Sequence, residues 1–442
     1  MKAHANKFID RARDVAPEGT FAVGAGLIVA AITAYVFVIV ALNSLVGANK
    51  AAFSAFWAFI FVAGPGLFLP IEQEVGRALA SRRAKGLGGK PLVMRAAQLG
   101  GVLTAGMVII TLVAAPLYVD GPFQGDWLLV VSLAIGLVGF YAMHLTRGTL
   151  SGNGRFRPYG EMLAAEGVAR LAGAIVLASL GTDNAGAYGM CIALAPFVAV
   201  LFALRGQRGL LLPGPTAPYS ELSNSLGWLL AGSVLMQLLA YSALLGISFL
   251  ETGEDKAAAA AFASAFFVAR IPVLLFQAVQ GTLLPKLASL AGAGRQNDFL
   301  TGLKQLLIVV TGIAAIGTVA AFTIGPAVGK ILFKDFTIDN RDLGLLALGS
   351  GVFIIALTIA QALIALRGHR AAALAWALGV VGFLVGTALV DGLPLEVEIG
   401  FVAGAVIATV AMATSLALRM RKGIPDGIEP LITAIEHEPL EI

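Results

Sequence analysis

One basic side chain lies inside an otherwise apolar run. Arg270 occupies the middle of a predicted membrane span, residues 257–284, two positions before Pro272. Gln277 follows seven positions later, so the two side chains project from one helical face. An ionisable residue within a span is costly and by default marks a functional site, and a guanidinium suits phosphate because it donates two parallel hydrogen bonds. The pattern favours an anion contact; the alternative is an arginine satisfied by neighbouring carbonyls.

Two carboxylates, Glu72 and Glu74, lie near the end of another predicted span, residues 51–76. A carboxylate within the membrane can bind a proton or Na⁺ and couple its gradient to transport. Alternatively, Glu74 with Arg77 three positions on, and Glu72 itself, only line the polar end of the helix. Both interpretations stay open.

A second intramembrane arginine has an acidic neighbour. Glu166 and Arg170 are four positions apart on the predicted span 161–180, on one helical face. We interpret them as a structural ion pair, because mutual neutralisation lowers the cost of insertion. His144 and Arg147, at the end of the preceding span, are interpreted as a feature of the mouth or interface and not as a relay.

No enzyme constellation accompanies these residues. The histidines His4, His144, His369 and His437 have no metal-ligand spacing, and no glycine-rich loop ends in Gly-Lys-Ser/Thr. We therefore predict no catalytic activity, no metal site and no cofactor. The lone Cys191 excludes an intramolecular disulfide.

The elements that must position these residues are membrane helices. Hydrophobic residues make up 58% of the 442 residues and charged residues 13%, against roughly 45–50% and 25% in soluble proteins. The composition excludes a soluble enzyme. Runs of about 20 apolar residues, enough to cross a bilayer, predict twelve spans: 21–45, 51–76, 96–118, 127–146, 161–180, 185–204, 226–250, 257–284, 303–326, 343–366, 371–390 and 397–418.

The basic residues are concentrated on one side of the membrane. Of the 30 Lys and Arg, 23 lie in the two terminal segments and in alternate loops. The opposite loops carry five of the basic residues and twelve acidic ones. By the positive-inside rule this predicts a multi-pass protein of the bacterial cytoplasmic membrane with both termini in the cytoplasm. The basic excess is thus a topology signal and gives no reason to expect a nucleic-acid partner.

A weak internal repeat divides the chain. Phe61-Val62-Ala63 matches Phe267-Val268-Ala269, and Leu79-Ala80-Ser81 matches Leu287-Ala288-Ser289, at offsets of 206 and 208. An offset of six spans preserves orientation and predicts two parallel six-helix lobes. The predicted parts are a cytosolic segment 1–20, an N-lobe 21–205, a linker 206–221, a C-lobe 222–418 and an acidic tail 419–442.

The chain resembles a transporter superfamily. The twelve spans in two parallel lobes, the basic loops after the second and eighth spans, and the loop GNGRFRPYGE after the fourth span are similar to the multidrug/oligosaccharidyl-lipid/polysaccharide (MOP) exporters. Within that superfamily the likeness is greatest to bacterial polysaccharide and O-antigen lipid-carrier flippases. Span 21–45 has no arginine and no thirteenth or fourteenth span exists, which departs from the lipid II flippase pattern.

The resemblance implies a function and a site. A flippase of this kind moves an undecaprenyl-pyrophosphate-linked oligosaccharide from the inner to the outer leaflet by alternating access. Arg270, Gln277 and Gln237 are the expected substrate-binding residues, with Glu72 and Glu74 as candidates for binding a coupling ion. The expected partners are the lipid-linked glycan, membrane lipid, and a glycan polymerase or glycosyltransferases.

Three other classes remain. A multidrug/toxin cation antiporter shares the superfamily architecture but needs an acidic cavity, and it ranks second. A major-facilitator transporter has a similar basic loop after the second span, GRALASRRAKG, but the acidic residue usual in that loop is missing here. A purely structural membrane protein offers no reason for an intramembrane arginine.

Overall fold

The computed structural model describes residues 20–222, 226–252, 256–273, 276 and 296–421. These parts are helical with short connections. The first half of the chain forms α2 (Thr20–Ser44), α3 (Ala48–Ala84), α4 (Lys90–Val113), the short η1 (Ala115–Leu117), α5 (Trp127–Gly152), α6 (Phe156–Ser179) and α7 (Ala185–Leu204). The six long helices correspond to the first six predicted spans.

The second half begins after the short η2 (Tyr219–Glu221) and is less regular. Its helices are α8 (Leu226–Ala240), α9 (Ser242–Leu250), α10 (Lys256–Ala269), α12 (Gln296–Thr323), α13 (Gly325–Leu332), α14 (Asn340–Ala365), α15 (His369–Ala388) and α16 (Leu395–Arg421). Predicted span 226–250 is bent by 60° between α8 and α9. Predicted span 257–284 begins as α10, and Gln277 lies outside the described residues.

Among the described residues, ten helices are long and apolar enough to cross a membrane, and the bent pair α8–α9 makes up to eleven. α10 and the residues just after it form a shorter apolar helix, Ala257–Val273. The protein is thus an all-α polytopic membrane protein, as predicted, and the count approximates the twelve predicted spans.

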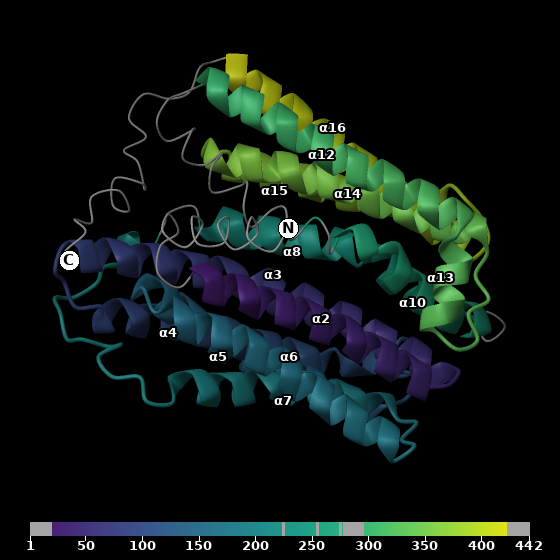
Figure 1. The fold of residues 1–442 in the computed structure, drawn as a ribbon, viewed down its shortest axis with the longest axis horizontal. Coiled ribbons are helices and arrows are strands. Elements are labelled where there is room, and N and C mark those ends of the chain that lie inside the picture. Colours follow the sequence, from purple (N-terminus) through teal and green to yellow (C-terminus); the bar gives the residue numbers. More distant parts are fainter. Residues whose placement is uncertain (1–19, 223–225, 253–255, 274–275, 277–295, 422–442) are drawn as a thin grey trace, which may run out of the picture.

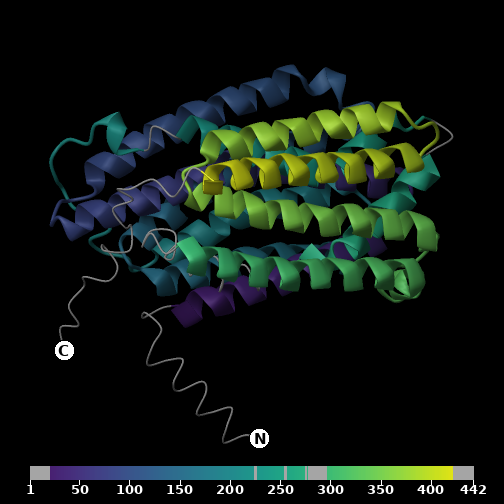
Figure 2. The same cartoon turned by 90° about the horizontal axis from the view of Figure 1, so that it is seen from above.

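The helices form two lobes whose long axes run nearly parallel (Figures 1 and 2). α2–α7 make the N-lobe and α8–α16 the C-lobe. We call the end that carries Arg82, Arg155 and Arg370 the basic end, and the end that carries Asp183 and Asp339 the acidic end. At the acidic end α13 reaches from the C-lobe toward α2, whereas at the basic end α12 and α16 stand away from the N-lobe (Figure 1).

Glycines allow the helices of each lobe to approach closely. On α2 and α6, a Cβ atom on Gly26 would overlap the carbonyl of Gly160, and one on Gly167 would overlap the hydroxyl of Thr33. On α15 and α16, a Cβ atom on Gly379 would lie 3.0 Å from the carbonyl oxygen of Gly404. Small residues at helix contacts give the close van der Waals packing on which association in lipid depends.

The connection between the lobes lies along the basic end of the N-lobe. The Lys90 amide donates to the Leu212 carbonyl over 3.0 Å, and Arg82 Nη1 lies 2.8 Å from Glu221 Oε2. This connection therefore belongs structurally to the N-lobe up to Glu221. The lobe and linker boundaries at residues 206 and 222 stay predictions.

Candidate functional site

The seam between the lobes is closed at the acidic end. Asn43 of α2 donates from Nδ2 to the Leu332 carbonyl (2.8 Å) and accepts at Oδ1 from the Lys334 amide (2.7 Å). Gln124 donates to Glu251 Oε1 over 2.5 Å. These bonds fasten the N-lobe to the ends of α9 and α13, so any opening at this end must break them.

Arg270 lies at the middle of the seam, where two helices end. α10 ends at Ala269 and the chain makes a turn at Arg270 before residues 271–273 are helical again, because Pro272 has no amide hydrogen to bond the Val268 carbonyl and its ring crowds that carbonyl. The Arg270 side chain donates from Nη1 to the carbonyl oxygen of Ala240, the last residue of α8, over 2.5 Å. Arg270 thereby joins the end of α10 to the bend between α8 and α9.

Aromatic rings surround the Arg270 guanidinium. Its central carbon lies 4.8 Å from the Tyr241 ring centroid and 5.0 Å from that of Phe266. Tyr35 of α2 donates to the Phe267 carbonyl over 2.7 Å, and Trp57 of α3 meets the Phe267 ring edge to face at 5.4 Å. A carbonyl and cation–π contacts offset part of the cost of this charge. No salt bridge to Arg270 occurs within the described part of the chain.

Of the other two residues expected to bind substrate, one can be placed. Gln237, on α8 one turn before the bend, donates from Nε2 to the Phe61 carbonyl of α3 over 3.1 Å. Gln237 and Arg270 thus meet at the same bend, and each donates to a backbone carbonyl. Gln277 lies outside the described residues.

A buried polar cluster, which we call the N-lobe network, contains Glu72, His144, Arg147 and Tyr159. Glu72 of α3 is 6% exposed. Its Oε2 lies 2.7 Å from His144 Nδ1, and its Oε1 accepts from the Tyr159 hydroxyl over 2.9 Å. Arg147 Nη2 lies 3.2 Å from Glu72 Oε1 and donates to the Tyr159 oxygen over 2.9 Å. The network joins α3, α5 and α6.

The sequence interpretation of His144 and Arg147 as a mouth or interface feature is wrong. His144 is 2% exposed, and both side chains bond Glu72 inside the N-lobe. The reason is that the glycine-lined contact between α3 and α5, at Gly148, draws the two helices together over this turn. Tyr159, within the loop GNGRFRPYGE, was not among the predicted site residues.

The Glu166–Arg170 ion pair lies on α6 and is a further buried charged group of the N-lobe. Arg170 Nη1 lies 3.1 Å from Glu166 Oε1, and the arginine is 3% exposed. The Arg170 guanidinium also lies 5.5 Å from the Phe37 ring centroid and 6.0 Å from that of Trp57. Trp57 therefore contacts both this pair and Phe267 across the seam, which links the N-lobe interior to the surroundings of Arg270.

Glu74 differs from Glu72. Its carboxylate pairs with Arg77 on the next turn of α3, and Arg77 also donates to the Glu221 carbonyl over 2.8 Å. Glu74 thus lies with the groups that hold the connection between the lobes. Within the described residues, no three His, Cys, Asp or Glu side chains are grouped to hold a metal ion.

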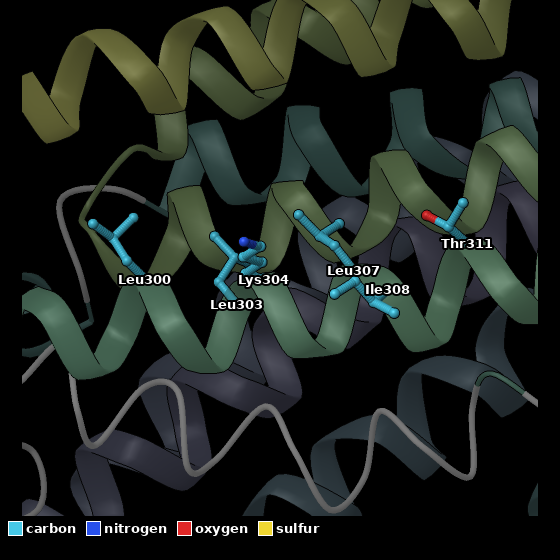
Figure 3. A pocket seen from close by; sticks show the side chains of 6 residues that line it. All are labelled: Leu300, Leu303, Lys304, Leu307, Ile308 and Thr311. Carbon is cyan, nitrogen blue, oxygen red and sulfur yellow. The ribbon is translucent and has the colours of Figure 1, made fainter.

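Two hollows accompany these groups. The interlobe cavity, of about 80 Å³, lies between α3 and the C-lobe helices α8, α14 and α15 near the basic end. A shallow groove of about 480 Å³ follows one face of α12 and is lined by Leu300, Leu303, Lys304, Leu307, Ile308 and Thr311 (Figure 3). The α12 groove is mostly aliphatic and offers the hydrocarbon contact expected of a lipid-facing surface.

Comparison with known proteins gives relatives without an assigned activity and solved structures with this fold. No family model matches the chain. An uncharacterized protein of Mycobacterium bovis is 27% identical over 389 residues (85% of this chain, 86% of the relative), and one of Mycobacterium tuberculosis is 28% identical over 418 residues (90% and 92%).

Solved structures of transporters share the architecture. One is a multidrug resistance MATE family transporter of the MOP superfamily in an inward-facing conformation, with TM-score 0.68 and 12% identity over 91% of this chain and 95% of that chain. Another is a MATE transporter of Vibrio cholerae, with TM-score 0.62 and 18% identity over 93% and 100%. The chain therefore has the two-lobe fold of MATE transporters of the MOP superfamily.

Proposed function

We propose that this protein flips a polyprenyl-diphosphate-linked oligosaccharide across the bacterial cytoplasmic membrane by alternating access of its two lobes. The observation that carries the proposal is the Arg270 guanidinium at the lobe seam, bound to the carbonyl at the α8–α9 bend with no carboxylate paired to it among the described residues. A cation placed so is suited to an anionic head group.

The position of Arg270 suggests how substrate would move the lobes. A diphosphate offers a stronger, charge-assisted acceptor than the neutral Ala240 carbonyl. Transfer of the guanidinium from the carbonyl to the diphosphate would release the end of α10 from the α8–α9 bend. Substrate binding and rearrangement of the seam would then be one event, and Gln237 would be free to leave the Phe61 carbonyl.

The orientation of the proposal follows the charge pattern. By the positive-inside rule, we take the basic end and both termini to face the cytoplasm. The closed acidic end, with its Asn43 bonds to α13, then makes this an inward-facing arrangement that takes substrate from the inner leaflet. Outward movement of an anion is favoured by about 2.3 kcal/mol per charge per 100 mV of inside-negative potential, so the membrane potential would assist this movement.

Of the two carboxylates considered for ion coupling, Glu72 suits the role better than Glu74. Glu72 bonds His144, a side chain of the type that gains and loses a proton near neutral pH, within a network that spans three helices. Glu74 is paired with Arg77 at the connection between the lobes. A proton shared by Glu72 and His144 would therefore change the charge inside the N-lobe.

A multidrug cation antiporter is the second candidate. It is favoured by the similarity in fold to MATE multidrug transporters and by the buried Glu72. The residues that line the interlobe cavity include no carboxylate, however, so no negative charge there attracts a cation. The partners proposed for the flippase are the glycosyltransferases or polymerase that supply and consume its lipid-linked glycan.

Transport by purified protein in sealed proteoliposomes separates the two candidates. We expect a fluorescent polyprenyl-diphosphate-linked saccharide to move between leaflets faster than in protein-free liposomes, and a cationic dye driven by a pH gradient to show no protein-dependent movement. Leaflet position is read by quenching with a membrane-impermeant reagent. Protein-dependent dye movement without lipid movement would replace the flippase with the antiporter.

A further inference from the structure

The interlobe cavity is assembled from both lobes. α3 of the N-lobe contributes Gln73, and the C-lobe contributes Ser233 of α8, Gln361 of α14 and His369 of α15. Rocking of one lobe against the other must therefore change the separation of Gln73 from the three C-lobe side chains. A ligand held here would be bound in one arrangement of the lobes and released in another.

Two polar atoms in this cavity lack a partner. Ser233 Oγ and His369 Nδ1 are buried and make no hydrogen bond in the structure. Nearly all buried polar atoms in proteins are hydrogen-bonded, so each exception calls for a bound molecule or another explanation. Both residues, Ser233 on α8 and His369 on α15, line the interlobe cavity, so a ligand in that cavity is the partner that we test for them.

The rest of the lining is uncharged and mostly aliphatic, with two tryptophans. Trp376 of α15 is buried, and Trp228 of α8 is 42% exposed, with the Arg370 guanidinium 5.5 Å from its ring centroid. Amide, hydroxyl and imidazole groups supply both donors and acceptors, and no carboxylate lines the cavity. This set suits a ring with hydroxyl edges and a weakly polar face, as in a sugar.

We propose that the interlobe cavity is the subsite for a saccharide ring of the transported lipid, an inference that rests on the proposed flippase function. The amides of Gln73 and Gln361 bond sugar hydroxyls, and Trp376 offers its apolar face. A cavity of about 80 Å³ holds two or three waters at about 30 Å³ each. A sugar ring therefore enters only when α3 and α8 move apart, so saccharide binding depends on the separation of the two lobes.

The test compares two lipids that differ only in the sugar. Affinity of the full-length protein in nanodiscs is measured for a polyprenyl-diphosphate-linked saccharide and for the same polyprenyl diphosphate without sugar. We expect Gln361→Leu and, separately, Ser233→Ala to weaken binding of the saccharide lipid about 3- to 10-fold each, the loss typical of one neutral hydrogen bond. Binding of the sugar-free lipid should be unchanged.

The control variant is Gln305→Leu, which removes an exposed amide from α12 and should alter neither affinity. Ser233→Ala adds no bulk, so it keeps the test valid if Gln361→Leu fails to fold. Equal weakening for both lipids, or no weakening for either, overturns the saccharide subsite. Failure of the unmodified protein to flip either lipid in proteoliposomes refutes the proposed function instead, whereas sugar-selective weakening of binding supports the subsite.

Discussion

Arg270→Gln is expected to reduce flipping of the saccharide lipid about 10- to 100-fold, the effect of losing one charge-assisted hydrogen bond. The substitution removes the only positive charge at the α8–α9 bend that the described residues provide, while its shorter amide can still donate. The diphosphate then has no cation to draw it into the seam. The initial rate of flipping in proteoliposomes measures the effect.

Two further variants sharpen this prediction. Arg270→Lys keeps the charge but loses the planar fork, so an intermediate rate is expected. Arg157→Gln removes an exposed arginine of the basic end, whose partner is Glu161, and should leave the rate unchanged. If Arg270→Gln flips the saccharide lipid at the unmodified rate and has normal thermal stability, Arg270 does not bind the diphosphate.

Arg147→Met is expected to lower the free energy of unfolding by about 3–5 kcal/mol, because it leaves the buried Glu72 carboxylate without its cation. The double variant Glu72→Gln/Arg147→Met should be less destabilised than the sum of its single variants by about 1–3 kcal/mol, since neither charge is then unpaired. Denaturant unfolding in mixed micelles, monitored by tryptophan fluorescence, measures all four states of this cycle.

The exposed pair Arg157–Glu161 provides the matched control for the N-lobe network. Its arginine side chain is 83% exposed, so Arg157→Met should change stability by less than about 1 kcal/mol. A buried network that costs no more to break than this surface pair, or a double variant that merely sums the single losses, would contradict the structural account.

Glu72→Gln should also remove any dependence of the flipping rate on a pH gradient, if Glu72 and His144 share the coupling proton.

The length of the apolar runs was enough to predict most of the spans, because lipid requires each membrane helix to satisfy its own backbone and to be apolar over its length. The ends were less predictable. α3 continues to Ala84, well past residue 76. Arg82, in its last turn, donates to Glu221 of the connection between the lobes, a partner that is distant in the sequence. The bend at Tyr241 carries no glycine or proline, and Arg270 contacts it from a distant part of the sequence, so no local pattern predicts it.

The candidate site was predictable only in part. Arg270 and Glu72 stood out because charge within a span is rare. Their partners did not, since the Ala240 carbonyl and the Tyr159 hydroxyl become partners only when distant helices pack together. His144 and Arg147 are three residues apart on one face of α5, and both bond the Glu72 carboxylate of another span. This spacing of two basic side chains is the sequence signal that could have predicted the N-lobe network.

Distances between the two lobes, measured at both ends of the seam, test most directly whether the lipid-linked saccharide drives alternating access. Spin labels at Val46 and Ile331 report the acidic end, and labels at Leu87 and Leu300 report the basic end; all four positions are exposed, and Cys191 is replaced by alanine. In nanodiscs, the saccharide lipid should lengthen the first distance and shorten the second, with the sugar-free lipid and a cationic dye producing less change. Distances that change only with the dye, or that change in the same direction at both ends, would contradict the proposed flippase mechanism.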